Sequence, residues 1–242
     1  AVPSVDLTGM TTGTAVYGQD VVIDNMLYAV IQRPPVLFSS VKSSNQAEVK
    51  KMAGVVDVID MPAASAPALF NPLGGIAVLA TNTWLAWQAC NALKTEWQTS
   101  DHASYNSDDY QQALLDNAAK PGEVMRKLGD FEQATADAAK VVDASYYAPH
   151  LAQAPMEPPA ATAVVTDDSA EIWACVQAPQ TARQQVAGAL KIPVENVTIN
   201  VTLLGGGFGR KAKPDFAVEA ALLAKQAGRP VKVVWRREDD IK

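Results

Sequence analysis

A glycine-rich run stands out in the sequence. The stretch LLGGGFGRKAKPDF, residues 203–216, has four glycines among positions 205–209, followed by an arginine and a lysine. Glycine has no Cβ, so its backbone adopts positive φ readily and lets another molecule approach the main chain closely. A helix that starts just after such a loop adds unpaired N–H groups and the positive end of its dipole. The run therefore favours an anionic or electron-rich ligand, and its alternative interpretation is a tight turn without a ligand.

The run satisfies neither of the common phosphate-binding motifs. A Walker loop requires Gly-Lys-Ser/Thr, but Lys211 follows Arg210 and precedes Ala212. The dinucleotide pattern G-x-G-x-x-G, begun at Gly205, requires a glycine where Arg210 stands. A nucleotide-binding module that uses the Gly205–Gly209 loop stays open as an alternative, although these residues do not favour it.

Composition disfavours several other kinds of site. The 242 residues carry a formal net charge of −6, which argues against a general nucleic-acid binder because phosphate neutralisation needs a surplus of Lys and Arg. Cys90 and Cys175 are the only cysteines, and His102 and His150 are the only histidines. These counts exclude a four-thiolate iron–sulfur centre within the chain and disfavour a zinc cluster. We expect no metal held by protein side chains, so a transition metal would have to bring its own ligands.

The segments around the glycine run predict an α+β fold. Runs of β-forming residues predict strands at 26–32, 55–60, 74–80, 196–204 and 230–235, and two strands around a TDDS turn at 162–176. Helical spacing and cap residues predict helices at 45–54, 81–97, 108–118, 181–191 and 215–226, with a capping box of Thr181 and Gln184. The charged run RREDD, 236–240, is interpreted as a solvated cluster at a strand end. The glycine run thus lies between a strand and a helix.

Several motifs, taken together, resemble one enzyme family. GGGFGRK (205–211), VQAPQTAR (176–183) and APMEPPAATA (154–163) follow TGTAVYGQD (12–20) and MLYAVIQRPP (26–35). This set resembles the molybdopterin-binding large subunit of the xanthine oxidase family of molybdenum hydroxylases, in the branch of isoquinoline 1-oxidoreductase β subunits and membrane-associated aldehyde dehydrogenases. The resemblance implies an α/β hammerhead domain at 1–105, a linker with a short helix at 106–130, and the first part of an α+β molybdopterin-binding domain at 131–242.

The resemblance implies roles for individual residues. Gln177 matches the catalytic-site glutamine whose carboxamide faces an oxygen ligand of molybdenum, although a surface turn before a proline would also suit a glutamine. The loop whose main chain contacts the metal centre and the pterin is matched by Gly206, Gly207, Phe208 and Gly209, and Phe208 is alternatively a core anchor. Arg210 is expected either to meet a phosphate or carbonyl of the cofactor or to form a surface salt bridge.

Some positions depart from the family pattern. Ala212 stands where purine-oxidising relatives have a glutamate, so a xanthine-type substrate is not expected, and Gln153 stands where many relatives have a histidine. Glu157 is expected mainly to pack near the active-site region rather than to act as a catalytic acid. The family's general base is a glutamate in a Gly-Glu motif far toward the C-terminus of the subunit, and nothing here replaces it. We therefore expect an N-terminal fragment that does not turn over substrate alone.

The implied activity is molybdenum-dependent hydroxylation of aldehydes or N-heterocycles with oxygen from water. The implied cofactor is molybdopterin with molybdenum, as the cytosine dinucleotide, while 2Fe–2S clusters belong to a separate small subunit that receives the electrons, with a cytochrome c as a further acceptor. The alternative from another class is a non-catalytic interaction domain that binds no small molecule. Substrate identity, oligomeric state and export stay open, and a periplasmic or membrane-associated location is compatible with the family branch.

Overall fold

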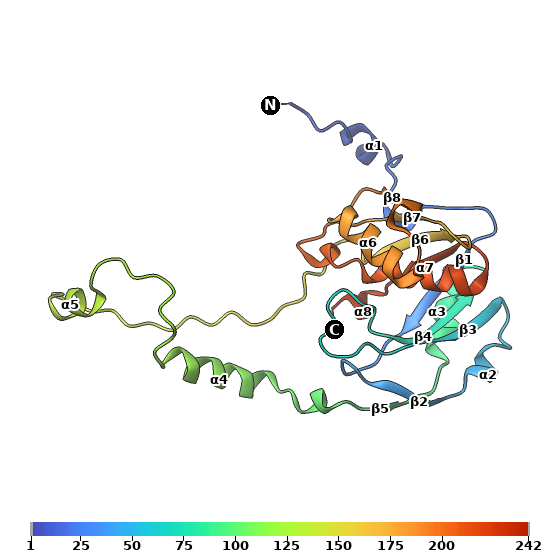
Figure 1. The fold of residues 1–242 in the computed structure, drawn as a ribbon. Coiled ribbons are helices and arrows are strands. Elements are labelled where there is room, and N and C mark those ends of the chain that lie inside the picture. Colours follow the sequence, from blue (N-terminus) through green and yellow to red (C-terminus); the bar gives the residue numbers. More distant parts are fainter. Residues whose placement is uncertain (1, 242) are drawn as a thin grey trace. The chain divides into compact units, whose positions relative to one another are not determined.

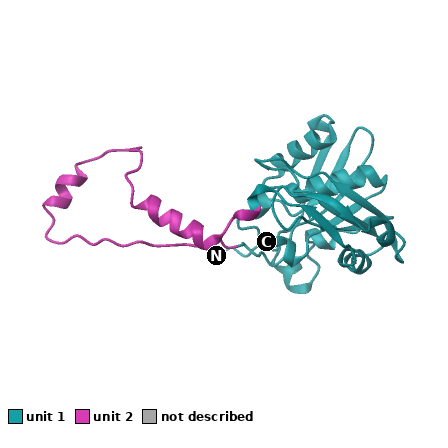
Figure 2. Cartoon of the chain, turned by 90° about the horizontal axis from the view of Figure 1, so that it is seen from below, with its two compact units in different colours: residues 1–102, 152–242 teal, residues 103–151 magenta. Residues whose placement is uncertain are grey.

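The computed structural model describes residues 2–241. The chain forms two compact units, one of Ala1–His102 with Ala152–Lys242 and one of Ala103–Leu151 (Figure 2). The larger unit contains the strands and every candidate site residue named above. The three-part division at residues 105 and 130 remains a prediction.

A seven-stranded mixed sheet forms the centre of the larger unit (Figure 1). Its strands follow the order β3 (Val55–Met61), β4 (Gly75–Ala80), β1 (Leu27–Gln32), β9 (Val231–Val234), β6 (Ala160–Val165), β7 (Ala170–Ala174) and β8 (Val197–Val201). β1 pairs in parallel with β9, and β7 with β8, whereas the other neighbours are antiparallel. Because β1 and β9 pair, segments from the two ends of the sequence share one sheet. A separate two-stranded sheet pairs β2 (Ser40–Ser44) with β5 (Thr95–Gln98).

Helices cover both faces of the seven-stranded sheet. Successive side chains of a strand point to opposite faces, and in β1 the side chains of Leu27, Ala29 and Ile31 belong to one core cluster while that of Val30 belongs to another. The first cluster includes residues of α6 (Pro179–Leu190) and α7 (Asp215–Ala227), and the second includes residues of α3 (Thr83–Asn91). The sheet is therefore buried on both sides, which explains why its central strands consist mostly of apolar residues.

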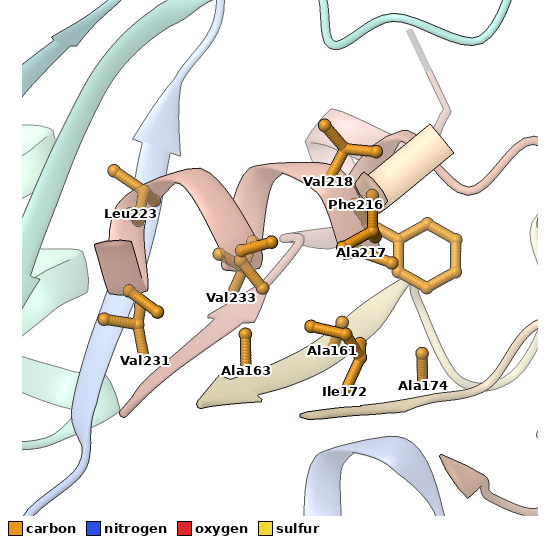
Figure 3. Packing of buried hydrophobic residues seen from close by; sticks show 14 of the residues in the cluster. Ala161, Ala163, Ile172, Ala174, Phe216, Ala217, Val218, Leu223, Val231 and Val233 are labelled. Carbon is orange, nitrogen blue, oxygen red and sulfur yellow. The ribbon is translucent and has the colours of Figure 1, made fainter. Parts of the chain in front are cut away.

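Small side chains let α7 lie close to the sheet. The helix packs on β6 and β9, where Ala161, Ala163 and Val233 belong to the same core cluster as Phe216 and Ala217 (Figure 3). Alanine has a small side chain, so the alanines of β6 leave room for the helix to approach the strand. This packing fixes the N-terminus of α7, which follows directly on the glycine-rich segment.

Most of the predicted elements form, and three predictions are wrong. The helix expected over 81–97 ends at Asn91, and the following residues form strand β5 because they pair with β2. The helix expected from Thr181 starts at Pro179 without a capping box, since proline is well suited to the first helical position. The RREDD run is not solvated throughout: it forms α8 (Arg237–Asp240), in which Asp239 and Asp240 are buried in ion pairs.

One edge of the sheet collects the chemically interesting residues. The parallel pairs end there, β1 at Gln32, β9 at Val234, β7 at Ala174 and β8 at Val201. The antiparallel strand β6 begins at the same edge, where Ala160 pairs with Val234. Ligands of sheets with parallel strands commonly bind beyond the carboxyl ends of those strands. The segments that leave this edge carry Arg33, Trp235, Gln177, Glu157 and the glycine-rich loop.

The smaller unit, Ala103–Leu151, has no hydrophobic core of its own. It contains α4 (Ser107–Ala118), capped by Asn106, and α5 (Phe131–Ala136), capped by Asp130, and no residue of 103–151 is buried.

The remaining short elements are α1 (Leu7–Thr12), α2 (Gln46–Val49), η1 (Gly18–Asp20), η2 (Asp101–Ser104), η3 (Val194–Asn196) and η4 (Arg210–Ala212). Within residues 2–241, no helix has the length and apolar character that crossing a membrane demands.

Candidate functional site

The glycine loop, residues 205–209, links the β8 edge of the sheet to η4. Its φ values are positive at Gly206 (97°), Phe208 (47°) and Gly209 (91°). Glycine adopts such values at little cost, whereas they are uncommon for a phenylalanine. The main-chain N–H groups of residues 206, 207 and 208 donate to no acceptor within residues 2–241. Three consecutive free amides form a donor surface of the kind that binds anionic oxygens.

Gln177, three residues beyond β7, lies against this loop. Its backbone N–H donates to the carbonyl of Lys211 at 3.0 Å, and its Oε1 accepts the N–H of Gly209 at 3.0 Å. A Cβ added to Gly207 would lie 2.7 Å from Cδ of Gln177, so the carboxamide packs directly on that glycine. The Nε2 group has no protein acceptor in the part of the chain that the structure describes, and the residue is exposed. The structure thus brings the predicted glutamine and the predicted loop together, with donors of both left for a ligand.

Glu157 fixes the start of the glycine loop through hydrogen bonds. Its carboxylate accepts the N–H of Gly205 at 3.2 Å, the N–H of Gln19 at 3.1 Å and the Nζ of Lys211 at 3.1 Å. Its own N–H donates to the carbonyl of Gly205 at 3.0 Å. The Lys211 side chain is 0% exposed, so this ion pair is removed from water. Glu157 therefore ties three segments together, in agreement with the expectation that it packs near the site.

Phe208 and Arg210 differ in how the structure places them. Phe208 is 72% exposed, so the alternative that it anchors the core is wrong. Arg210 forms a bidentate pair with Asp215, with nitrogen–oxygen distances of 3.1 Å, and its guanidinium lies 4.6 Å from the ring centre of Trp235. The Arg210 side chain is largely buried, so its salt bridge is not the surface pair that the sequence suggested. Its predicted contact with a cofactor remains a prediction.

A second ion pair supports Trp235. Arg33, directly after β1, makes two hydrogen bonds to Glu219 of α7, one of them 2.8 Å long, and lies 3.7 Å over the Trp235 ring. The indole Nε1 donates to the same Glu219 carboxylate at 2.9 Å. Arg33 is buried, which lowers the pKa of its guanidinium, but the Glu219 carboxylate outweighs this and the pKa is raised overall. The N-terminal part of the chain is thereby fixed to α7 and, through Trp235, to Arg210.

A cavity of about 510 Å³ opens beside this cluster. It is lined by Gln32, Arg33, Pro34, Pro35, Leu37, Leu73, Trp97, Arg210, Lys213, Asp215, Trp235, Arg236 and Asp239. Its volume falls in the range of small-molecule sites in proteins. Arg210 adjoins both the cavity and the glycine loop.

Both cysteines are buried, and their thiols are not prepared for chemistry. Burial raises the pKa of Cys175 to about 11, with a further contribution from the Glu157 carboxylate, and burial likewise raises the pKa of Cys90 to about 11. At about pH 8, only about one thiol in a thousand would be a thiolate, and the thiolate is the nucleophile. We expect iodoacetamide to leave both cysteines unmodified in the folded protein and to alkylate both in concentrated guanidinium chloride, as read by mass spectrometry. Rapid alkylation of either thiol in the folded protein would contradict this burial.

The sequence did not identify the charged partners that hold the site. Lys211 belongs to the positively charged run after the glycines, yet it is fully buried, and the buried pair of Glu219 and Arg33 has no place in the sequence-based prediction. A usable signal exists for Glu219, because it lies within the apolar helical run AVEAALLA, where a charge requires a buried partner. No comparable signal marks Arg33, whose partner lies on a distant segment.

The residues present fit a ligand that carries electron-rich oxygens. The free amides at 206–208 and the Nε2 of Gln177 are donors. Because Gly207 has no Cβ, the Gln177 carboxamide can lie directly against it, where the N–H of Gly209 holds its oxygen. Within residues 2–241, no three side chains of His, Cys, Asp or Glu come together as metal ligands. A metal bound at this loop would need its ligands from the bound group itself.

Comparisons with known proteins agree with this arrangement. The sequence model of a family described as molybdopterin cofactor-binding domain matches residues 115–242, which include the glycine loop and Gln177. The chain is 33% identical, over 98% of its length, to a membrane-bound aldehyde dehydrogenase (pyrroloquinoline-quinone) of Gluconacetobacter polyoxogenes. It is 29% identical, over 99% of its length, to isoquinoline 1-oxidoreductase subunit beta of Brevundimonas diminuta. The chain spans 31% of the length of each of these two relatives.

Solved structures share the fold. Quinoline 2-oxidoreductase from Pseudomonas putida 86 superimposes with a TM-score of 0.75 at 23% identity, over 99% of this chain and 35% of that one. An aldehyde oxidoreductase from Desulfovibrio gigas superimposes with a TM-score of 0.74 at 19% identity, over 97% of this chain and 30% of that one. The family match covers more than half of the chain, and the predicted fold and the predicted resemblance are both confirmed. The chain therefore belongs to the molybdopterin cofactor-binding domain family.

Proposed function

We propose that this chain is the part of a molybdenum-dependent oxidoreductase that binds one side of the cofactor through its glycine loop and Gln177. The observation that carries the proposal is the set of free N–H groups at residues 206–208 beside the unpaired Nε2 of Gln177. The overall reaction is hydroxylation of an aldehyde or N-heterocycle: the substrate gains an oxygen atom from water, and substrate and water together release two electrons and two protons. The names of the relatives support these two substrate classes.

The name of one relative contains pyrroloquinoline quinone, whereas the matched family binds molybdopterin. We propose molybdopterin for this chain because the family match includes the loop and Gln177. The cofactor would supply the two-electron redox centre. We further propose that it is the cytosine dinucleotide form, that 2Fe–2S clusters in a separate small subunit receive the electrons, and that a cytochrome c accepts them in turn. A relative named as a β subunit supports assembly with other subunits.

The chain's own residues would bind the cofactor and orient it. The amides of Gly206, Gly207 and Phe208 would hold electron-rich atoms of the cofactor, and the Gln177 carboxamide, fixed at its oxygen by Gly209, would direct its Nε2 donors at an oxygen there. Glu157 keeps the loop in this shape by holding Gly205. No residue of the chain is assigned as the general base, so we propose that these 242 residues alone do not turn over substrate.

The test of the function uses the full-length subunit with its small subunit, produced in a host that makes the cofactor. Oxidation of benzaldehyde or isoquinoline in ¹⁸O-labelled water should give product that carries the label. Gln177→Ala should lower kcat/KM by about 10²–10³-fold, as losing one preorganised donor typically does. The exposed neighbour Gln180 provides the matched control, and Gln180→Ala should change nothing. Unlabelled product, or tight binding of ATP or NAD without molybdenum, would reject the proposal.

A further inference from the structure

The cavity beside Trp235 is lined by several cationic side chains, and their charge balance indicates what it can bind. Three of its arginines already have carboxylate partners: Arg33 pairs with Glu219, Arg210 with Asp215, and Arg236 with Asp239. Arg236 is satisfied at every nitrogen, since NH1 also donates to Asn91 and the other two nitrogens donate to Asp239. In each pair the carboxylate neutralises the arginine, so the three arginines shape the cavity without adding net charge to it.

Lys213 is the exception among the cations that line the cavity. Its nearest carboxylate in the described residues is Asp215, at 3.6 Å, which is beyond a good hydrogen bond. Both oxygens of Asp215 already accept from Arg210, and Oδ1 also accepts the N–H of Phe216. One carboxylate thus faces two cations, and the cavity keeps one positive charge without a counterpart. The Lys213 side chain is 28% exposed, so part of it is accessible to a ligand.

The rest of the cavity wall suits a flat apolar group. Trp97 is partly exposed at the cavity, and Pro34, Pro35 and Leu37 add apolar surface. Trp235 is buried under the guanidinium groups of Arg33 and Arg210, so Trp97 is the aromatic face left for a ligand. Aromatic rings pack on one another in offset or edge-to-face geometry.

We propose that this cavity binds a small planar monoanion of the aromatic carboxylate class. The carboxylate pairs with the ammonium group of Lys213, and the ring packs against Trp97 and the two prolines. The single uncompensated charge favours a monoanion over a neutral molecule or a dianion. If the proposed function holds, such carboxylates are also the products of aldehyde oxidation, and this link alone rests on that function.

The test measures binding to the purified chain without any cofactor, by calorimetry and by quenching of tryptophan fluorescence. Benzoate should bind at one site, and its uncharged analogue benzamide should bind at least about tenfold more weakly, because benzamide lacks the negative charge that strengthens a hydrogen bond with the ammonium group of Lys213. Lys213→Met should weaken benzoate binding by a similar factor, and Lys213→Arg should retain most of it. Lys51→Met, at an exposed lysine away from the cavity, should have no effect.

A second variant separates the two parts of the site. Trp97→Ala should weaken benzoate but leave acetate unchanged, because only the ring loses its partner. No saturable benzoate binding, equal binding of benzamide, inorganic phosphate binding more tightly than benzoate, or an unaltered Lys213→Met variant would each overturn the proposal. Failure here leaves molybdenum binding at the glycine loop unaffected, and a failure of molybdenum binding leaves benzoate binding intact, so the two proposals fail separately.

Discussion

Glu157→Gln is expected to lower the free energy of unfolding by about 3–5 kcal/mol, the usual effect of removing one partner of a buried ion pair. Lys211 would keep its charge in a fully buried position without a carboxylate. The same change would weaken the acceptor that holds the N–H groups of Gly205 and Gln19. Urea denaturation followed by circular dichroism measures the loss.

A double variant tests the reason for this loss. In Glu157→Gln with Lys211→Met, both charges are absent, and a buried pair replaced by uncharged residues of similar size is often neutral in stability. We therefore expect most of the loss to be recovered. If the single and double variants are equally unstable, the uncompensated lysine is not the cause, and the account of this pair is wrong.

Glu219→Gln is expected to have an effect of similar size, about 3–5 kcal/mol, because it removes the charge that compensates the buried Arg33. The carboxylate also accepts the indole N–H of Trp235. We expect a lower unfolding midpoint in urea and a changed tryptophan fluorescence spectrum, since the environment of the indole is altered.

The exposed pair of Lys50 and Asp57 provides the matched control. Their charged atoms are 2.6 Å apart, but both side chains face solvent. Surface ion pairs contribute about 0–1 kcal/mol, so Asp57→Asn should change stability by less than about 1 kcal/mol. An effect of Glu219→Gln as small as that of Asp57→Asn would mean that the Arg33–Glu219 pair does not stabilise the attachment of Arg33 to α7.

The sequence could predict the elements and the loop because local patterns determine them. The strand over 196–204 alternates, the helix over 215–226 has apolar spacing and a glycine after it, and the glycine run lies between them. The structure forms β8 and α7 there, with the loop at the carboxyl edge. Motif order added Gln177, which local patterns alone would have assigned to a turn.

Long-range pairing could not be predicted in this way. Nothing local indicates that β1 pairs with β9, or that Arg33 reaches Glu219 across 186 positions. Residues Thr95–Gln98 continue an apparently helical segment, but pairing with β2 makes them a strand. The RREDD run looked like a solvated surface because sequence shows charge but not burial, and two of its aspartates are buried against arginines.

The central claim is that the bare main chain at 206–208, with the Gln177 carboxamide, holds the molybdenum cofactor. Its most direct test is the molybdenum content of the purified full-length subunit, measured by mass spectrometry for Gly207→Ala. A Cβ there would lie 2.7 Å from Cδ and Oε1 of Gln177 and would displace the carboxamide, whereas a Cβ at Gly188 meets nothing within 4 Å, which makes Gly188→Ala the control. We predict a loss of molybdenum of about 10–100-fold in Gly207→Ala at unchanged secondary structure, as for other residues that orient a metal site. Full molybdenum occupancy in that variant would contradict the account.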